Sequence, residues 1–145
     1  MESEVKSSSI DAVLKLTLPD GLKVMLVDGA FVRKVIDTDF IGGGHHYAYP
    51  LWMAEDEIWL EETFNTSEQR YILMHEVAEH YLMKYLNLDY LQAHVIANGL
   101  ERQFRNDADM LHEFPERMEA YNVMFYCTEL RENAPKIMQA IIDYK

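Results

Sequence analysis

The pattern of the sequence changes near residue 65, and this change limits the folds that are open to the chain. Before it, apolar residues alternate with polar ones between turns. After it, apolar residues recur every three or four positions, as they do along an amphipathic helix. The order predicts an α+β fold, with a small N-terminal antiparallel sheet in residues 1–64 and about four helices in residues 65–145. At 145 residues the chain has room for a single domain.

Residues 1–64 contain three segments with the pattern of β-strands. Segments 12–18 and 22–27 flank a Pro-Asp-Gly turn, so they predict a hairpin. Segment 57–61 alternates polar and apolar residues, which predicts a third strand, at an edge of the sheet. Segment 30–36 fits a short helix or another strand equally well.

Four segments after residue 65 have the periodicity of helices. Thr66 or Ser67 can cap the first and Asp89 the second, because a short polar side chain accepts a hydrogen bond from the first turn. Pro115 and Pro135 mark the starts of the third and fourth, where a missing N–H is harmless. The predicted helices cover residues 66–86, 90–106, 115–133 and 135–145.

The chain is acidic, with a formal net charge of −12 at neutral pH. This charge repels phosphate backbones and anionic lipids, so neither nucleic acid nor a membrane is an expected partner. No stretch approaches the roughly 18 apolar residues of a membrane span, and no signal peptide is evident, so we expect a cytoplasmic protein. The single cysteine, Cys127, allows no internal disulfide and is expected to be buried in a helix.

The first predicted helix carries two ionisable residues on its apolar face. Residues four apart return to within about 40° of each other around a helix. One stripe therefore contains Ile72, His75, Glu79, Leu82 and Leu86. Because three of these residues are apolar, the stripe should face the core. A carboxylate buried there must be paired, protonated or bound to a metal.

His75 and Glu79, one helical turn apart, can bind the same metal ion. Their spacing is that of the HExxH zinc motif, with a glutamate in place of the second histidine. Glu76 follows the first histidine, at the place of the general base in HExxH hydrolases. His80 lies about 140° around the helix from His75, so these two histidines are not expected to bind one ion.

The second predicted helix offers further donors on one face. His94 and Glu101 lie seven residues apart, and Ala93 and Ala97 between them allow the first helix to approach closely. We expect His94 to be the third ligand, and Glu101 to support a ligand or to replace one. Zinc is the expected metal, and iron or manganese also suit such donors. The predicted ligands are His75, Glu79 and His94.

Two further histidines, His45 and His46, follow three consecutive glycines that predict a loop. We expect this pair to be exposed to solvent. Either histidine could instead join the site or flank a substrate cleft, and the sequence leaves this open.

A sheet followed by a helix bearing His75-Glu76-x-x-Glu79 resembles the zincin metallopeptidases. The resemblance covers the motif and the order of the elements. It departs from the family at Glu79, where zincins have a histidine. It implies a zincin-like fold, a bound zinc, Glu76 as general base, and a peptide or protein substrate aligned along an edge strand such as segment 57–61.

The chain also resembles uncharacterised small phage and prokaryotic proteins. These share a Gly-His-rich loop, a Glu-Ile-Trp strand, a His-Glu-x-x-Glu helix and a downstream Ala-His. The corresponding residues here are 43–46, 57–59, 75–79 and 93–94. This second resemblance implies no activity.

Two functions of different classes fit these features. The leading hypothesis is a metal-dependent, peptidase-like hydrolase that uses zinc-activated water, with Glu76 as general base. The alternative is a non-catalytic acidic module that binds a partner and contains a structural metal or a buried His–Glu network. The oligomeric state stays open.

Overall fold

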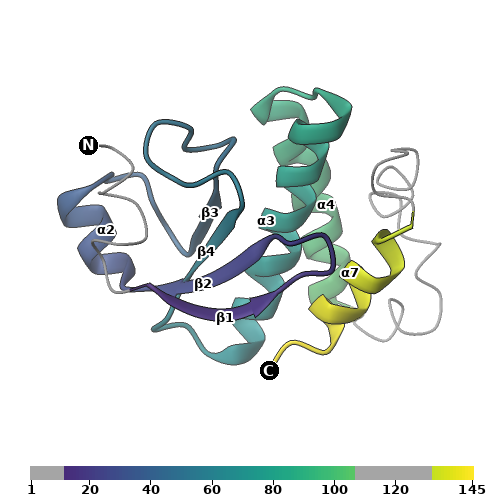
Figure 1. The fold of residues 1–145 in the computed structure, drawn as a ribbon, viewed down its shortest axis with the longest axis horizontal. Helices are drawn as coiled ribbons and strands as arrows, with labels where there is room; N and C mark the ends of the chain where they lie inside the picture. The colour runs from purple at the N-terminus through teal and green to yellow at the C-terminus, as the bar shows by residue number, and fades with distance from the viewer. Residues whose placement is uncertain (1–11, 107–131) are drawn as a thin grey trace.

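The computed structural model describes residues 12–106 and 132–145, which form an α+β fold (Figure 1). All four strands that the structure describes precede the long helices, as predicted. Of the predicted helix 115–133, the structure describes only the last two residues. The rest of it, including Cys127, lies outside the described residues. In chain order the elements are β1 (Val13–Thr17), β2 (Lys23–Val27), α2 (Gly29–Val35), β3 (Gly43–His45), β4 (Glu57–Glu61), α3 (Thr66–Leu86), α4 (Tyr90–Asn106) and α7 (Ala134–Ile142).

The four strands form one mixed sheet in the order β1-β2-β4-β3. β1 and β2 form the predicted antiparallel hairpin, but β2 and β4 run parallel, so the expectation of a purely antiparallel sheet is wrong for the central pair. The chain passes through α2 and β3 between these two strands, which gives it the length that a parallel connection needs. β4 lies between β2 and β3 and is buried along its whole length, so the prediction that it is an edge strand is also wrong. The edge strands are β1 and β3.

The segment whose structure the sequence left undecided forms the helix α2. The Asp28 side chain caps it by accepting a hydrogen bond from the N–H of Phe31 at 3.2 Å. From this helix, Arg33 donates two hydrogen bonds to the carboxylate of Glu61, at 2.7 and 3.1 Å. The N–H of Gly42 donates a third, at 3.1 Å. Glu61 thereby ties together α2, the end of β4 and the chain before β3.

Acid should destabilise the fold partly by protonating Glu61. The hydrogen bonds from Arg33 hold the pKa of Glu61 below its usual range, against the effect of burial. Because the folded pKa lies below the unfolded value of about 4.3, this carboxylate stabilises the fold above that pH, and its contribution is lost as the pH falls through the lowered pKa. In urea unfolding between about pH 7 and about pH 3, Glu61→Gln should have a lower midpoint than the wild type at neutral pH. Its midpoint should also fall less than that of the wild type as the pH is lowered. A fall in the midpoint as large as that of the wild type would contradict this prediction.

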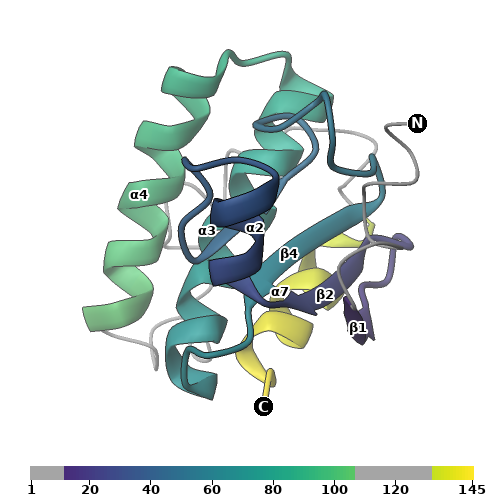
Figure 2. The same cartoon turned by 90° about the vertical axis from the view of Figure 1, so that its left-hand side faces the viewer.

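α3 is the central helix of the fold. It lies between the sheet and α4 (Figure 1 and Figure 2), and all residues from 73 to 82 are buried. The bounds of the helix are as predicted, but the cap is Asn65 rather than Thr66 or Ser67. The Asn65 side chain accepts a hydrogen bond from the N–H of Glu68 at 2.8 Å. The helix therefore carries its ionisable residues into the interior on more than one face.

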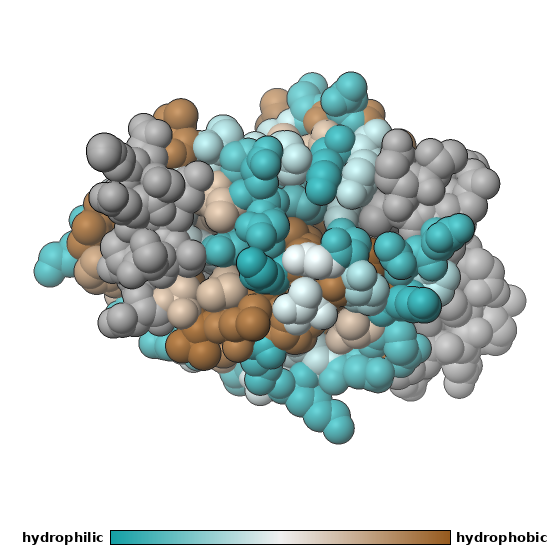
Figure 3. All heavy atoms as spheres, in the orientation of Figure 1, coloured by the Kyte–Doolittle hydropathy of each residue, from teal (hydrophilic) through white to brown (hydrophobic). Residues whose placement is uncertain are grey.

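The remaining helices flank α3. The Asp89 side chain caps α4, as predicted, by accepting a hydrogen bond from the N–H of Gln92 at 2.8 Å. α7 contacts α3 and has Pro135 in its first turn. Hydrophilic and apolar residues are mixed on the coloured part of the face in Figure 3, and an apolar patch lies over β1, where Val13 and Leu14 are 58% and 53% exposed. Within residues 12–106 and 132–145, no helix is long and apolar enough to cross a membrane.

Candidate metal centre

The carboxylate of Glu79 is the meeting point of three imidazole rings. Nε2 of His75 and Nδ1 of His94 lie 3.0 and 2.8 Å from its Oε2 atom. Nε2 of His45 lies 2.8 Å from the other oxygen, Oε1. These side chains come from β3, α3 and α4. The cluster therefore forms only when the sheet and both helices have packed together.

Close packing of α3 and α4 brings His94 to Glu79. Ala93 and Ala97 are completely buried on the face of α4 that meets α3. Their small side chains let the two helices approach closely, as the sequence predicts. The structure thus brings together the three residues that the sequence marks as ligands.

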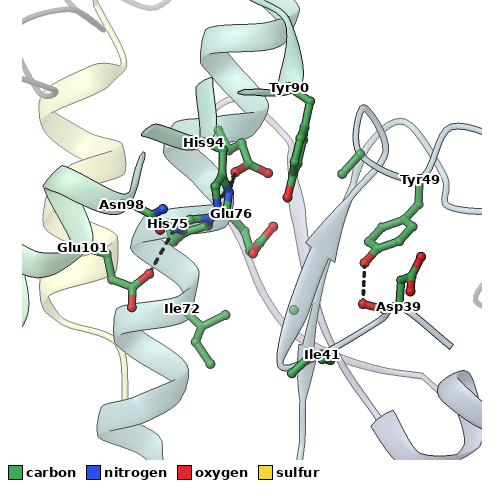
Figure 4. A pocket seen from close by; sticks show the side chains of 13 residues that line it. Asp39, Ile41, Tyr49, Ile72, His75, Glu76, Tyr90, His94, Asn98 and Glu101 are labelled. Atoms are coloured by element: carbon green, nitrogen blue, oxygen red, sulfur yellow. Dashed lines mark hydrogen bonds and ion pairs between the residues drawn. The ribbon is translucent and has the colours of Figure 1, made fainter. Parts of the chain in front are cut away.

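Glu101 holds the far side of the His75 ring. Its Oε1 atom lies 3.0 Å from Nδ1 of His75, so the two groups form a close ion pair (Figure 4). Its other oxygen accepts a hydrogen bond from Nε of Arg105 at 2.7 Å. Glu101 therefore lies where it orients His75, which is one of the two roles expected for it.

Charges within the cluster are strongly coupled. Burial opposes the charge of Glu79, but hydrogen bonds with His45, His75 and His94 outweigh it and lower the pKa of Glu79 to about 2. Burial also opposes the charge of His75, yet its contacts with Glu101 and Glu79 raise the pKa of His75 to about 10. Burial lowers the pKa of His45, so that ring is neutral. Glu79 is therefore an anion, which a positively charged partner stabilises.

The donor atoms of His75, Glu79 and His94 fit a divalent metal ion. All three lie within 4.8 Å of one another. Bonds of about 2.0–2.1 Å to a tetrahedral zinc would place neighbouring donors about 3.4 Å apart. The observed distances of 2.8 and 3.0 Å to Oε2 would have to open by about half an ångström. A cation would take the place of the protons on the two nitrogens that face Oε2.

Glu76 is buried beside this cluster, and no hydrogen bond from the described part of the chain reaches its carboxyl group. One of its oxygens lies within 4.8 Å of the donor atoms of His45 and Glu79. Burial raises the pKa of Glu76 to about 8. The positive charge of His75 acts against this shift, and the negative charges of Glu79 and Glu101 add to it. A carboxyl group with a pKa close to neutrality can take up a proton and release it again.

A cavity of about 310 Å³ leads to these residues (Figure 4). Its lining combines aromatic, apolar and acidic side chains and contains no lysine or arginine. Such a lining suits a neutral or positively charged ligand better than an anion. The lining residues are Asp39, Ile41, Gly43, Ala48, Tyr49, Ile72, His75, Glu76, Glu79, Tyr90, His94, Asn98 and Glu101.

The expectation that His45 is exposed in a loop is wrong. This residue is completely buried at the end of β3 and contacts Glu79. The glycines before it are the signal that could have located it. A Cβ atom on Gly43 would come within 2.7 Å of Ile72 and 3.2 Å of Glu76, so only a bare backbone lets β3 approach α3 this closely. His46 is partly buried and does not contact the cluster.

His80 does not join the cluster, as its place on the helix predicts. It is completely buried, and neither ring nitrogen has a hydrogen-bond partner among the described residues. Its ring packs against those of His45, Tyr47 and Tyr81, with centroid distances of 5.6, 5.2 and 5.2 Å. Burial lowers the pKa of His80 to about 3, so the ring is neutral. An unpartnered imidazole in this place lowers the stability of the fold.

Replacing His80 by phenylalanine should stabilise the protein by about 1–3 kcal/mol, the desolvation cost of an unpaired buried polar group. The flat phenyl ring keeps the packing against the neighbouring aromatic rings. The free energy of unfolding in urea at neutral pH measures the effect. His46→Phe is the matched control and should destabilise the fold, because Nδ1 of His46 makes a 2.7 Å hydrogen bond with the carbonyl group of Met53. An unchanged or lower free energy for His80→Phe would contradict the prediction.

No family model, no curated protein and no solved structure matches this chain. Similarity to known proteins therefore assigns neither a family nor an activity. What the protein does has to be argued from the donor set, the buried glutamate beside it and the cavity that leads to both.

Proposed function

We propose that the protein is a small metal-dependent hydrolase of the peptidase type, in which His75, Glu79 and His94 hold zinc. One observation carries the proposal: two imidazoles and a carboxylate converge at a cavity with a second buried carboxyl group, Glu76, beside them. Three protein ligands are typical of catalytic zinc sites, where the fourth position stays open. Iron or manganese would also accept these donors.

The residues around the donor set have distinct roles in this proposal. When bound, zinc supplies a Lewis acid that polarises a carbonyl group and makes water more acidic. Glu76 takes a proton from the attacking water and passes it to the leaving amine, since its buried carboxyl group lies beside the donor set. Glu101 fixes the ring of His75, and Arg105 in turn fixes Glu101. The ring of His75 is thus already oriented in the metal-free protein.

A peptide or protein is the proposed substrate. Ile41, Tyr49 and Tyr90 line the cavity and offer apolar contacts to the side chains of a peptide. β3, rather than β4, is the edge strand beside the cavity, so the peptide is proposed to lie along β3. The net charge of −12 disfavours nucleic acids and anionic membranes as partners.

Metal analysis combined with peptide hydrolysis tests this proposal. Protein purified without nickel resin should contain about one zinc ion per chain and should cleave members of a fluorogenic peptide pool. A chelator should remove both the zinc and the activity, and added zinc should restore both. Protein that neither contains nor takes up zinc would refute the proposal. Zinc without hydrolysis would favour a structural metal.

A non-catalytic module is the second candidate function, because the contacts of Glu79 are satisfied without any ion. Three hydrogen bonds of 2.8, 2.8 and 3.0 Å to His45, His94 and His75 balance its charge. In this case the acidic surface binds a partner, and the buried His–Glu network holds the fold together. Thermal unfolding separates this metal-free network from a metal site, since zinc should raise the melting temperature only if it binds the folded state.

A further inference from the structure

We infer that His45 is a positioning residue of the proposed metal centre: it donates a hydrogen bond to one oxygen of Glu79 and so leaves the other oxygen to bind a single ion. The inference rests on the proposed function, because it concerns the same site. It adds a residue from the sheet to a site whose other members come from two helices. It also sets the number of ions that the site holds.

The two oxygens of Glu79 have separate partners. Oε2 faces His75 and His94, whereas Oε1 faces Nε2 of His45 at 2.8 Å. The side chains of His45 and Glu79 are 0% and 2% exposed, so water does not compete for this hydrogen bond. Glu79 is therefore held with one oxygen engaged and one oxygen turned toward the two histidines.

The backbone of Tyr47 determines which nitrogen of His45 carries the ring proton. The N–H of Tyr47 donates a hydrogen bond to Nδ1 of His45 at 3.2 Å. Nδ1 is therefore an acceptor, and the proton of the neutral ring lies on Nε2. Nε2 can then only donate, and the acceptor that it faces is Oε1 of Glu79.

This tautomer argues against a second metal ion. His45, Glu76 and Glu79 also have donor atoms within 4.8 Å of one another, and a bridging Glu79 could hold two ions about 3.5–4 Å apart. If Nε2 of His45 bound an ion, the ring proton would have to move to Nδ1. Two N–H groups would then face each other across the 3.2 Å that separate Nδ1 from the nitrogen of Tyr47. One ion per chain is therefore expected, with His45 outside its ligands.

Two substitutions at position 45 separate a hydrogen-bond donor from a residue that only fills space. His45→Gln puts an amide N–H in the place of Nε2–H, whereas His45→Phe keeps a ring without a donor. Competition with a chromophoric chelator should show zinc affinity reduced about 10–100-fold in His45→Phe and largely restored in His45→Gln. All three proteins should bind one zinc ion per chain. Equal affinity in His45→Phe and wild type, or two ions in the wild type and one in His45→Phe, would overturn the inference.

The tautomer can also be read in the wild-type protein, which keeps the inference testable if a variant does not fold. Nitrogen NMR of zinc-loaded protein with ¹⁵N-labelled histidine should show His45 protonated at Nε2 and unprotonated at Nδ1. A proton on Nδ1 would overturn the inference. A wild type that takes up no zinc would refute the proposed metal centre itself, whereas unaltered zinc affinity in His45→Phe would refute only the role of His45.

Discussion

Glu79→Gln should abolish zinc binding and should destabilise the metal-free protein by about 3–5 kcal/mol, the usual cost of removing one partner from a buried ion pair. The amide removes the charge on which three imidazoles converge, and it replaces the proposed metal ligand with a weaker one. Glu79 is 1% exposed, so water cannot take over its contacts. The loss of zinc affinity should exceed the roughly 10–100-fold caused by losing a hydrogen-bond partner of a ligand.

Zinc binding and urea unfolding of metal-free protein measure these two effects separately. Glu62→Gln is the matched control: Glu62 is exposed, and its substitution should change neither quantity. If Glu79→Gln does not fold, His94→Ala provides a second test, because the side chain of His94 is 37% exposed and can be removed with less disturbance. Wild-type zinc affinity in either variant would contradict the proposed ligand set.

Glu76→Gln should lower the rate of peptide hydrolysis about 10²–10⁴-fold while zinc stays bound. The amide has the shape of the acid but cannot accept a proton from water. The turnover number should fall and the Michaelis constant should change little, because Glu76 is proposed to act on the attacking water rather than on the bound peptide. This pattern would distinguish a general base from a residue that binds substrate.

The control for this prediction is Glu55→Gln, an exposed change that should leave hydrolysis unaltered. Zinc content is measured on the same samples. Unchanged hydrolysis in Glu76→Gln, with zinc present, would remove Glu76 from the mechanism. Loss of zinc from this variant would instead make Glu76 a ligand.

The helical half of the site could be predicted from the sequence because helix geometry is local. A spacing of four residues places His75 and Glu79 on one face whatever the rest of the chain does. The small residues Ala93 and Ala97 mark the contact face of α4, and they bring His94 with them. The bounds of both helices follow from the same local pattern.

The sheet half of the site could not be predicted, because it depends on contacts between distant residues. His45 lies 34 positions before Glu79, and its place follows from the pairing of β3 with β4. The alternation in β4 suggested a strand with a solvent-facing side. Glu61 is nevertheless buried, because Arg33, 28 positions earlier, supplies its counter-charge. Neither partner is visible in the local pattern.

The bare backbone at Gly43 restricts how the cavity can be altered. Even a single methyl group there would press on Ile72 and Glu76 from the side of the strand. Changes to the proposed substrate preference would therefore have to be made at other lining residues, such as Ile41, which is 73% exposed. A library that varies Ile41 and leaves Gly43 untouched would change the lining of the cavity and keep the close packing of β3 against α3.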